Sequence, residues 1–170
     1  MKVLIEALAV VVIFVLGGIA LVYSGTYNVA ATSPDSKIVQ WLLSTTMDRS
    51  VAMHADRTTA VAELSDEQAL EGFRVYNQTC IICHGAPGKD PGDIGKGLNP
   101  EPPYLSDTAG EWSRAQLFWI IKNGIKMTGM PAFGPTHNDN EIWNLVAFVQ
   151  KLPKMTPEQY SQMEQSPVSR

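Results

Sequence analysis

The sequence predicts an all-α protein in which one membrane-spanning helix precedes a compact helical domain. An apolar run of 21 residues with a single charge, Glu6, extends from Val3 to Tyr23 near the start of the chain. Further on, a Ser or Asn is followed three residues later by a Gln or Glu at three places, the capping-box pattern that starts helices. No stretch of the chain alternates apolar and polar residues as a half-buried strand does. We therefore expect helices throughout.

The apolar run is long enough to cross a bilayer, which needs about 20 residues. A secretory signal peptide is the alternative, because Lys2 supplies a basic start and residues 29–31 are small enough for cleavage. The apolar core of a signal peptide is shorter, about 7 to 15 residues, so residues 1–23 are interpreted as an uncleaved transmembrane anchor. Lys2 is the only basic residue before the span, which favours an inside N-terminus and an extracytoplasmic remainder.

Residues 24–64 are expected to form an extracytoplasmic helical linker. Ser33 is a plausible N-cap and Pro34 suits the first helical position, so the sequence predicts a helix from Ser33 to about Ala55. Its larger apolar residues lie roughly on one side: Ile38, Trp41, Leu42, Met47 and Val51. This helix is either a spacer or a surface that binds a partner. His54 within it is expected to be a solvated polar residue rather than a metal ligand.

Residues 65–153 are expected to form the compact domain, with three capped helices. The capping pairs are Ser65 with Gln68, Ser113 with Gln116, and Asn138 with Glu141. The first helix should reach Cys80, the second should stop at Gly124, and the third is too apolar to be exposed. The Gly- and Pro-rich residues 85–105 should lack regular structure. Residues 154–170 should start a helix at Thr156 and continue as a frayed C-terminal tail.

Composition excludes several classes of protein. The chain has 170 residues, a formal net charge of −4 and two cysteines. A length in this range indicates one domain with attachments rather than a multidomain enzyme. Two cysteines cannot build a disulfide framework, and a negative net charge is the wrong sign for binding nucleic acid.

The motif that carries chemistry is Cys80-Ile81-Ile82-Cys83-His84. C-x-x-C-H is the attachment sequence of c-type haem, in which two thiols bond to the porphyrin and the next residue lies under the iron. A thioredoxin-like redox pair is one alternative, but it requires a βαβ unit. A zinc site is another, but only His54, His84 and His137 could join the two thiols. We therefore expect one covalent haem c with His84 as an iron ligand.

The sixth iron ligand should come from the other face of the ring, and three residues are candidates. Met130 is followed by Pro131, which keeps the chain extended and out of a helix, as suits a loop that presents a sulfur atom. Met127 could serve instead, although only one of the two can face the iron; otherwise it packs at the haem edge. His137 precedes the last helix, where a polar residue usually caps or forms hydrogen bonds. Met130 is the preferred ligand.

In these motifs the domain resembles a class I c-type cytochrome. The family pairs a haem-attachment motif after an N-terminal helix with a Met-Pro ligand loop before a C-terminal helix. The resemblance covers about half of the chain, and its residues are Gly72, Tyr76, Cys80, Cys83, His84, Gly85 and the run from Asn123 to Phe133. It implies a class I cytochrome c fold, preceded here by the transmembrane helix and the helical juxtamembrane segment. The first helix should cross the last near Gly72.

The resemblance also implies roles around the haem. Pro103 stands where the family's backbone carbonyl accepts a hydrogen bond from the axial histidine, which fixes the imidazole orientation. Leu105, Ile121, Ile125 and Phe133 would line the pocket. Trp112 and Trp119 are possible donors to the haem propionates, although a buried Trp is more often simply a core residue. The segment 24–64 does not match the minimal family pattern.

A haem held by both His84 and Met130 has no open coordination position, so it carries electrons and does not bind substrates. The sequence thus predicts a non-enzymatic, membrane-anchored respiratory electron carrier on the periplasmic side of the cytoplasmic membrane. It would link a quinol-oxidising or dehydrogenase complex to a terminal acceptor. One alternative is a fixed haem subunit of a larger complex, with the anchor and the Trp41 helix as docking elements. Another is a haem enzyme or gas sensor in which Met130 is displaced. Redox proteins are the expected partners, with no nucleic acid and no small-molecule substrate.

Overall fold

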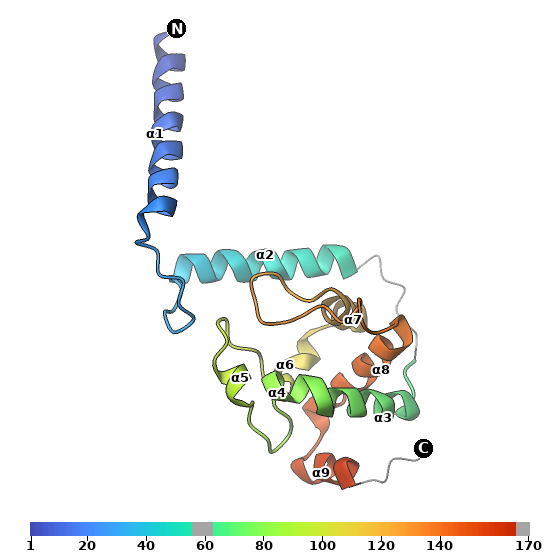
Figure 1. Cartoon of the computed structure of the whole chain (residues 1–170). Helices are drawn as coiled ribbons and strands as arrows, with labels where there is room; N and C mark the ends of the chain where they lie inside the picture. Colours follow the sequence, from blue (N-terminus) through green and yellow to red (C-terminus); the bar gives the residue numbers. More distant parts are fainter. Residues whose placement is uncertain (56–62, 166–170) are drawn as a thin grey trace. The chain divides into compact units, whose positions relative to one another are not determined.

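The computed structural model describes residues 1–55 and 63–165, and within these ranges every regular element is helical (Figure 1). The all-α prediction is confirmed. The chain divides into two compact units, Met1–Pro34 and Asp35–Arg170. Residues 56–62 of the expected linker and 166–170 of the expected tail lie outside the described residues. The division into four functional segments stays a prediction.

The first unit consists mainly of helix α1, Lys2–Ser24. An 18-residue stretch of α1 has a mean hydropathy of 2.8, and none of the side chains of the helix is buried. Among the described residues it is the one helix long and apolar enough to cross a membrane. The helix ends at Gly25, whose φ of 68° is in the left-handed region that glycine adopts freely. The predicted N-terminal apolar helix is therefore present, with the length and composition of a membrane span.

Helix α2 spans Lys37–Ala55 and belongs to the second unit. The prediction that Ser33 caps this helix is wrong, because α2 begins only at Lys37 and Ser33 lies in the turn before it, where its amide donates to the Ala30 carbonyl. Ser36 is positioned to cap it instead, since its hydroxyl accepts from the Val39 amide at 3.3 Å. The C-terminal half of α2 packs on α7, where Val51 and Ala55 are buried.

The helical path into the Cys80 motif is longer than predicted. Helix α3, Asp66–Val75, continues through the π-helical turn η1, Tyr76–Cys80, into α4, Ile81–His84. The capping box at its start is confirmed, because Ser65 and Gln68 exchange backbone-to-side-chain hydrogen bonds of 3.1 and 3.0 Å. The path ends at Gly85, where φ is 62°. The motif therefore lies on helical backbone up to His84.

Two further helices begin at predicted capping boxes. Helix α7 spans Arg114–Asn123 and stops at Gly124, and α8 spans Asp139–Val149. Helices α3 and α8 pack so closely that a Cβ atom on Gly72 would lie 1.9 Å from the Asn144 carbonyl oxygen. The predicted crossing near Gly72 is confirmed.

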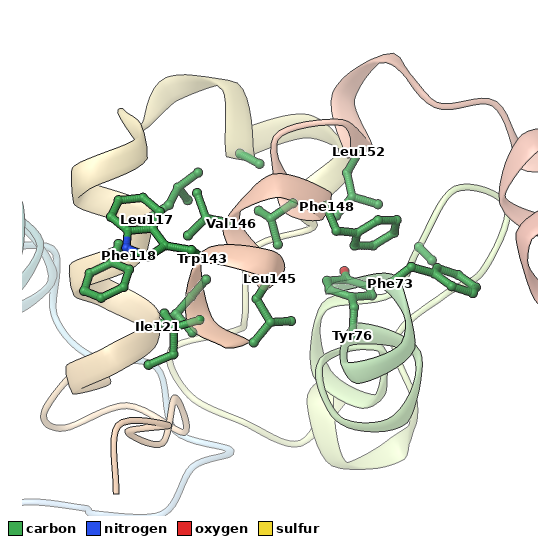
Figure 2. Close-up of a cluster of buried hydrophobic side chains, with 14 of the residues drawn as sticks. Phe73, Tyr76, Leu117, Phe118, Ile121, Trp143, Leu145, Val146, Phe148 and Leu152 are labelled. Atoms are coloured by element: carbon green, nitrogen blue, oxygen red, sulfur yellow. The ribbon is translucent and has the colours of Figure 1, made fainter. Parts of the chain in front are cut away.

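The core is built around α8, which is almost wholly buried, as its apolar sequence predicts. Figure 2 shows its side chains between those of α3 and α7. On the α3 side the rings of Phe73 and Phe148 meet edge to face at 5.4 Å, and on the α7 side Phe118 stacks on Trp143 at 4.3 Å. This core connects α3, which continues into the segment that carries the cysteines, to α7 and α8, the helices before and after Met130.

Two sequence predictions need correction. Residues 85–105, expected to lack regular structure, contain one helical turn, α5 at Asp93–Lys96. Helix α6, Leu105–Thr108, begins at the last of these residues, and the short 3₁₀ segment η2, Ala109–Glu111, follows it. Beyond the 3₁₀ segment η3 at Leu152–Lys154, the predicted helix start at Thr156 is confirmed, but α9, Pro157–Gln165, is packed on the domain and is not frayed over these residues. Tyr160 of α9 is fully buried, its ring is 5.3 Å from that of Phe73, and its hydroxyl donates to Asn77. This tertiary contact holds α9 on the domain.

Candidate haem-binding site

The two cysteines lie one helical turn apart on a single surface. Cys80 ends η1 and Cys83 lies in α4, with His84 directly after it. Both thiols are free and half-buried. The backbone of α5 rests against the motif, because the Gly92 amide donates to the Ile82 carbonyl at 2.9 Å and a Cβ atom on Gly95 would lie 2.8 Å from the Cys83 backbone. The attachment motif is thus a helical segment whose backbone is held by hydrogen bonding and packing against the α5 segment.

His84 is held by a hydrogen bond between its Nδ1 atom and the Pro103 carbonyl oxygen, 2.8 Å apart. Because a carbonyl can only accept, Nδ1 carries the proton and Nε2 keeps its lone pair. Burial lowers the pKa of His84, although the hydrogen bond acts in the opposite direction. The imidazole is therefore neutral, oriented and ready to donate Nε2 to a metal, which is the form that binds iron.

Two tyrosines hold the backbone that follows His84. The Tyr76 hydroxyl donates to the Gly85 carbonyl at 2.7 Å, and the Tyr104 hydroxyl donates to the Ala86 carbonyl. A Cβ atom on Gly85 would lie 2.6 Å from the Tyr104 ring, so this position requires glycine both for its φ and for its lack of a side chain. The holding role of the tyrosines was not predicted. The only sequence signals are that Tyr104 follows Pro103 and that Tyr76 lies four residues before the motif.

The loop from Gly124 to Pro131 is closed on itself by hydrogen bonds. The Ile125 amide donates to the Met130 carbonyl at 3.2 Å. The Thr128 hydroxyl donates to the Ile125 carbonyl at 2.8 Å and accepts from the Met130 amide at 3.1 Å. Gly124 has a φ of 65°, and a Cβ atom there would lie within 2.8 Å of the backbone of Met130 and its neighbours. Local hydrogen bonds and close backbone packing therefore hold the backbone around Met130 in one conformation.

Met130 and Met127 differ in their surroundings. The Met130 side chain is half-buried and packs against the hydrophobic core, whereas Met127 is 78% exposed and has a positive φ of 60°. His137, the third candidate, interacts locally, because its Nδ1 atom is 2.9 Å from the Thr136 hydroxyl and its ring contacts Phe133. These surroundings favour Met130, and its role as an iron ligand stays a prediction.

The remaining residues named from the resemblance are apolar neighbours of the core. Leu105 and Phe133 are half-buried against it, Ile121 is buried and Ile125 is half-buried. Trp112 also packs against the core, whereas the Trp119 ring contacts the His54 ring of α2 in a tilted arrangement, with ring centroids 5.5 Å apart. His54 is exposed, as expected, but this ring contact was not predicted. The haem-facing roles of all six residues stay predictions.

The two alternative interpretations of the motif fit the structure poorly. A reactive redox cysteine has a lowered pKa and commonly opens a helix, whereas burial raises the pKa of Cys80 to about 11 and the motif closes a helix. Nowhere in residues 1–55 and 63–165 do three or more His, Cys, Asp or Glu side chains gather as a metal cluster would require. By contrast, two thiols, a neutral imidazole and a thioether among apolar side chains fit a c-type haem.

The comparison with known families identifies the class of this domain. Residues 67–149 match the family model described as "Cytochrome C oxidase, cbb3-type, subunit III". Residues 67–149 therefore form a c-type cytochrome domain, a class whose cofactor is haem c. The predicted class is confirmed.

A solved structure also resembles the chain. It is titled "Kuenenia stuttgartiensis reducing HAO-like protein complex Kustc0457/Kustc0458", and the match has 22% sequence identity and a TM-score of 0.46. The match covers 56% of this chain and half the length of that chain.

Proposed function

We propose that this protein carries single electrons through one haem c that is bonded to Cys80 and Cys83 and ligated by His84 and Met130. The observation that carries the proposal is the 2.8 Å hydrogen bond from His84 to the Pro103 carbonyl. It leaves Nε2 free for iron and orients the imidazole, which is the outer-sphere contact expected of an axial histidine. Residues 1–23 would anchor the chain as a single-pass protein of the cytoplasmic membrane, with the haem domain on the periplasmic side.

The bound haem supplies a one-electron Fe(III)/Fe(II) couple. The residues of this chain set its properties in three ways. His84 and Met130 would hold the haem iron, and a thioether ligand would raise the reduction potential relative to a second histidine. The hydrogen-bonded loop around Met130 holds the sulfur in place. Apolar residues such as Leu105 and Phe133 would exclude water, which favours the less charged ferrous state.

Electrons would pass from a quinol-oxidising or dehydrogenase complex to a terminal acceptor. A fixed haem subunit of a larger redox complex is the second candidate, because the family description names a subunit of an oxidase. Gentle detergent purification separates the two. A stoichiometric complex containing this chain indicates a subunit, and a lone protein indicates a free carrier.

Haem attachment is tested with Cys80→Ser and Cys83→Ser, alone and together. After denaturation and acid-acetone extraction, haem should stay on the wild-type polypeptide and be absent from the double variant. Each single variant should retain at most one thioether bond. Extraction of all haem from the wild type would contradict covalent attachment.

An open-iron enzyme or gas sensor is tested with carbon monoxide. The absorption spectrum of the reduced protein should not change when carbon monoxide is added, because Met130 would hold the sixth coordination position of the iron. Rapid formation of a carbonyl spectrum would favour the open-iron alternative.

A further inference from the structure

Helix α2 has apolar side chains on two faces, and the described fold covers only one of them. Val51 and Ala55 face α7 and are buried. On the other face the exposed fractions are large: 76% for Ile38, 65% for Trp41, 55% for Leu42 and 65% for Met53. Trp41, Leu42, Arg49 and Met53 border one continuous shallow groove, so they share a surface. We call Ile38, Trp41, Leu42, Arg49 and Met53 the outer face of α2.

The charge of α2 differs in sign from that of the whole chain. Two basic residues, Lys37 and Arg49, against the single acid Asp48 give the helix a formal charge of +1, whereas the chain carries −4. The outer face itself includes Arg49 and no acidic residue. An Arg beside exposed Trp, Leu and Met side chains can lay its aliphatic stem along the apolar surface and hold its charge at the level of lipid phosphate. Tryptophan in particular is enriched at that level.

The connection to α1 limits how far the outer face of α2 can lie from a bilayer. Helix α1 ends at Ser24 and α2 begins at Lys37, so the chain between them spans at most about 45 Å even when fully extended. If α1 spans the membrane, as the proposed function requires, the start of α2 stays within that reach. Such tethering raises the effective concentration of the helix at the lipid surface and makes even a weak contact significant.

We propose that the outer face of α2 lies on an anionic lipid surface. Trp41, Leu42 and Met53 insert at the level of the headgroups, and Arg49 pairs with lipid phosphate while its aliphatic stem covers apolar surface. Because Val51 and Ala55 join α2 to α7, this contact also sets which side of the haem domain faces the membrane. The proposal rests on the anchor assigned under the proposed function.

The test uses the full-length holoprotein in nanodiscs that contain phosphatidylglycerol, one protein per disc. Half of the preparations carry lipids brominated near the glycerol end of their acyl chains, which quench tryptophan on contact. The emission of Trp41 is the difference between the wild type and Trp41→Phe. The brominated lipid should cause a loss of that emission. Discs of zwitterionic lipid should show a smaller loss, because Arg49 then lacks an excess of negative charge to pair with.

Two variants of neighbouring leucines provide a matched pair. Leu42→Gln places an amide on the outer face and should reduce the bromine quenching of Trp41. Leu43→Gln makes the same change about 100° around the helix, at a side chain that is 39% exposed, and should leave the quenching as in the wild type. Equal effects of the two variants would overturn the proposed orientation.

Trp41 emission that is unaffected by brominated lipid overturns the proposal and leaves the outer face to a protein partner. Co-elution of the haem absorbance with the discs is recorded in the same experiment. It reports the anchor and the haem independently of α2, so a failure of the proposed function is distinguishable from a failure of this inference.

Discussion

The Tyr76 hydroxyl donates a 2.7 Å hydrogen bond to the carbonyl of Gly85, the residue directly after His84. Tyr76 lies one helical turn before the Cys80 motif and Gly85 directly follows it, so this hydrogen bond connects the backbone on the two sides of the motif. Burial raises the pKa of Tyr76 well above its usual range, which keeps the hydroxyl protonated and able to donate. Tyr104 makes the corresponding bond to Ala86 from the segment that carries Pro103.

Tyr76→Phe should destabilise the domain and disturb the axial histidine. The variant leaves the buried Gly85 carbonyl without its donor, at a cost of about 1 to 3 kcal/mol in the free energy of unfolding. Urea unfolding measures that loss. Tyr160→Phe is the control, because it removes a hydroxyl that bonds to Asn77 and not to the motif. The reduction potential should shift in Tyr76→Phe only, and a shift of equal size in both variants would argue against a specific role for Tyr76.

Met130→Ala should abolish the sulfur-to-iron charge-transfer band and lower the reduction potential, because the thioether ligand that favours ferrous iron is lost. Met127→Ala is the matched control, since it removes an exposed thioether three residues away. The control should keep the band and the potential. Spectroscopy of the oxidised protein together with redox titration measures both. The opposite pattern would assign the ligand to Met127.

Gly72→Ala should destabilise the packing of α3 on α8. The added Cβ atom would lie 1.9 Å from the backbone oxygen of Asn144, so the helices must separate, and such overpacking costs about 1 to 3 kcal/mol. Denaturant unfolding measures the change. Gly110→Ala is the control, because a Cβ atom there would lie 3.9 Å from the Cγ atom of Pro153, an ordinary van der Waals contact. If the two variants unfold alike, the close crossing is not what requires glycine at position 72.

The ion pair between Asp66 and Lys151 should make stability depend on pH in the acid range. A hydrogen bond from Lys151 and its charge lower the pKa of Asp66 below the usual 3.8. The pair therefore stabilises the fold above pH 3.8, and this contribution is lost as the pH falls through the lower pKa of the folded state. Asp66→Asn should remove this part of the acid dependence, measured by unfolding between pH 6 and 2.

The control for this pH effect is Glu67→Gln, which removes a carboxylate from the same first turn of α3. Glu67 forms none of the ion pairs found in the described parts of the chain. The pH profile of this variant should therefore follow that of the wild type. An unchanged profile in Asp66→Asn would refute the assigned role of the pair. The pair is exposed, so its effect should also weaken in high salt.

Removing residues 1–23 should reduce electron transfer in membranes more than high salt does with the full-length protein. Between Ser65 and Pro153 there are ten acidic and seven basic residues, a formal charge of −3, so charge steering should be modest. Tethering instead raises the effective concentration at the membrane. The haem spectrum should not change. Equal rates for the truncated and anchored forms at matched total concentration would contradict the argument.

Much of the fold follows from local sequence because local hydrogen bonds determine it. The Ser65, Ser113 and Asn138 capping boxes involve residues only three positions apart, and each starts its helix in the structure as predicted. Gly124 ends a helix for an equally local reason, its positive φ. The Cys80 motif and the Met130-Pro131 pair likewise identify the c-type cytochrome class from short patterns.

Tertiary contacts determined what short patterns could not. Helix α9 has a polar sequence, but it is ordered because Tyr160 is buried against Phe73, which lies 87 positions earlier. The holding role of Tyr104 and the contact between His54 and Trp119 also join residues far apart in the chain. Such contacts depend on how helices pack, so no local pattern encodes them.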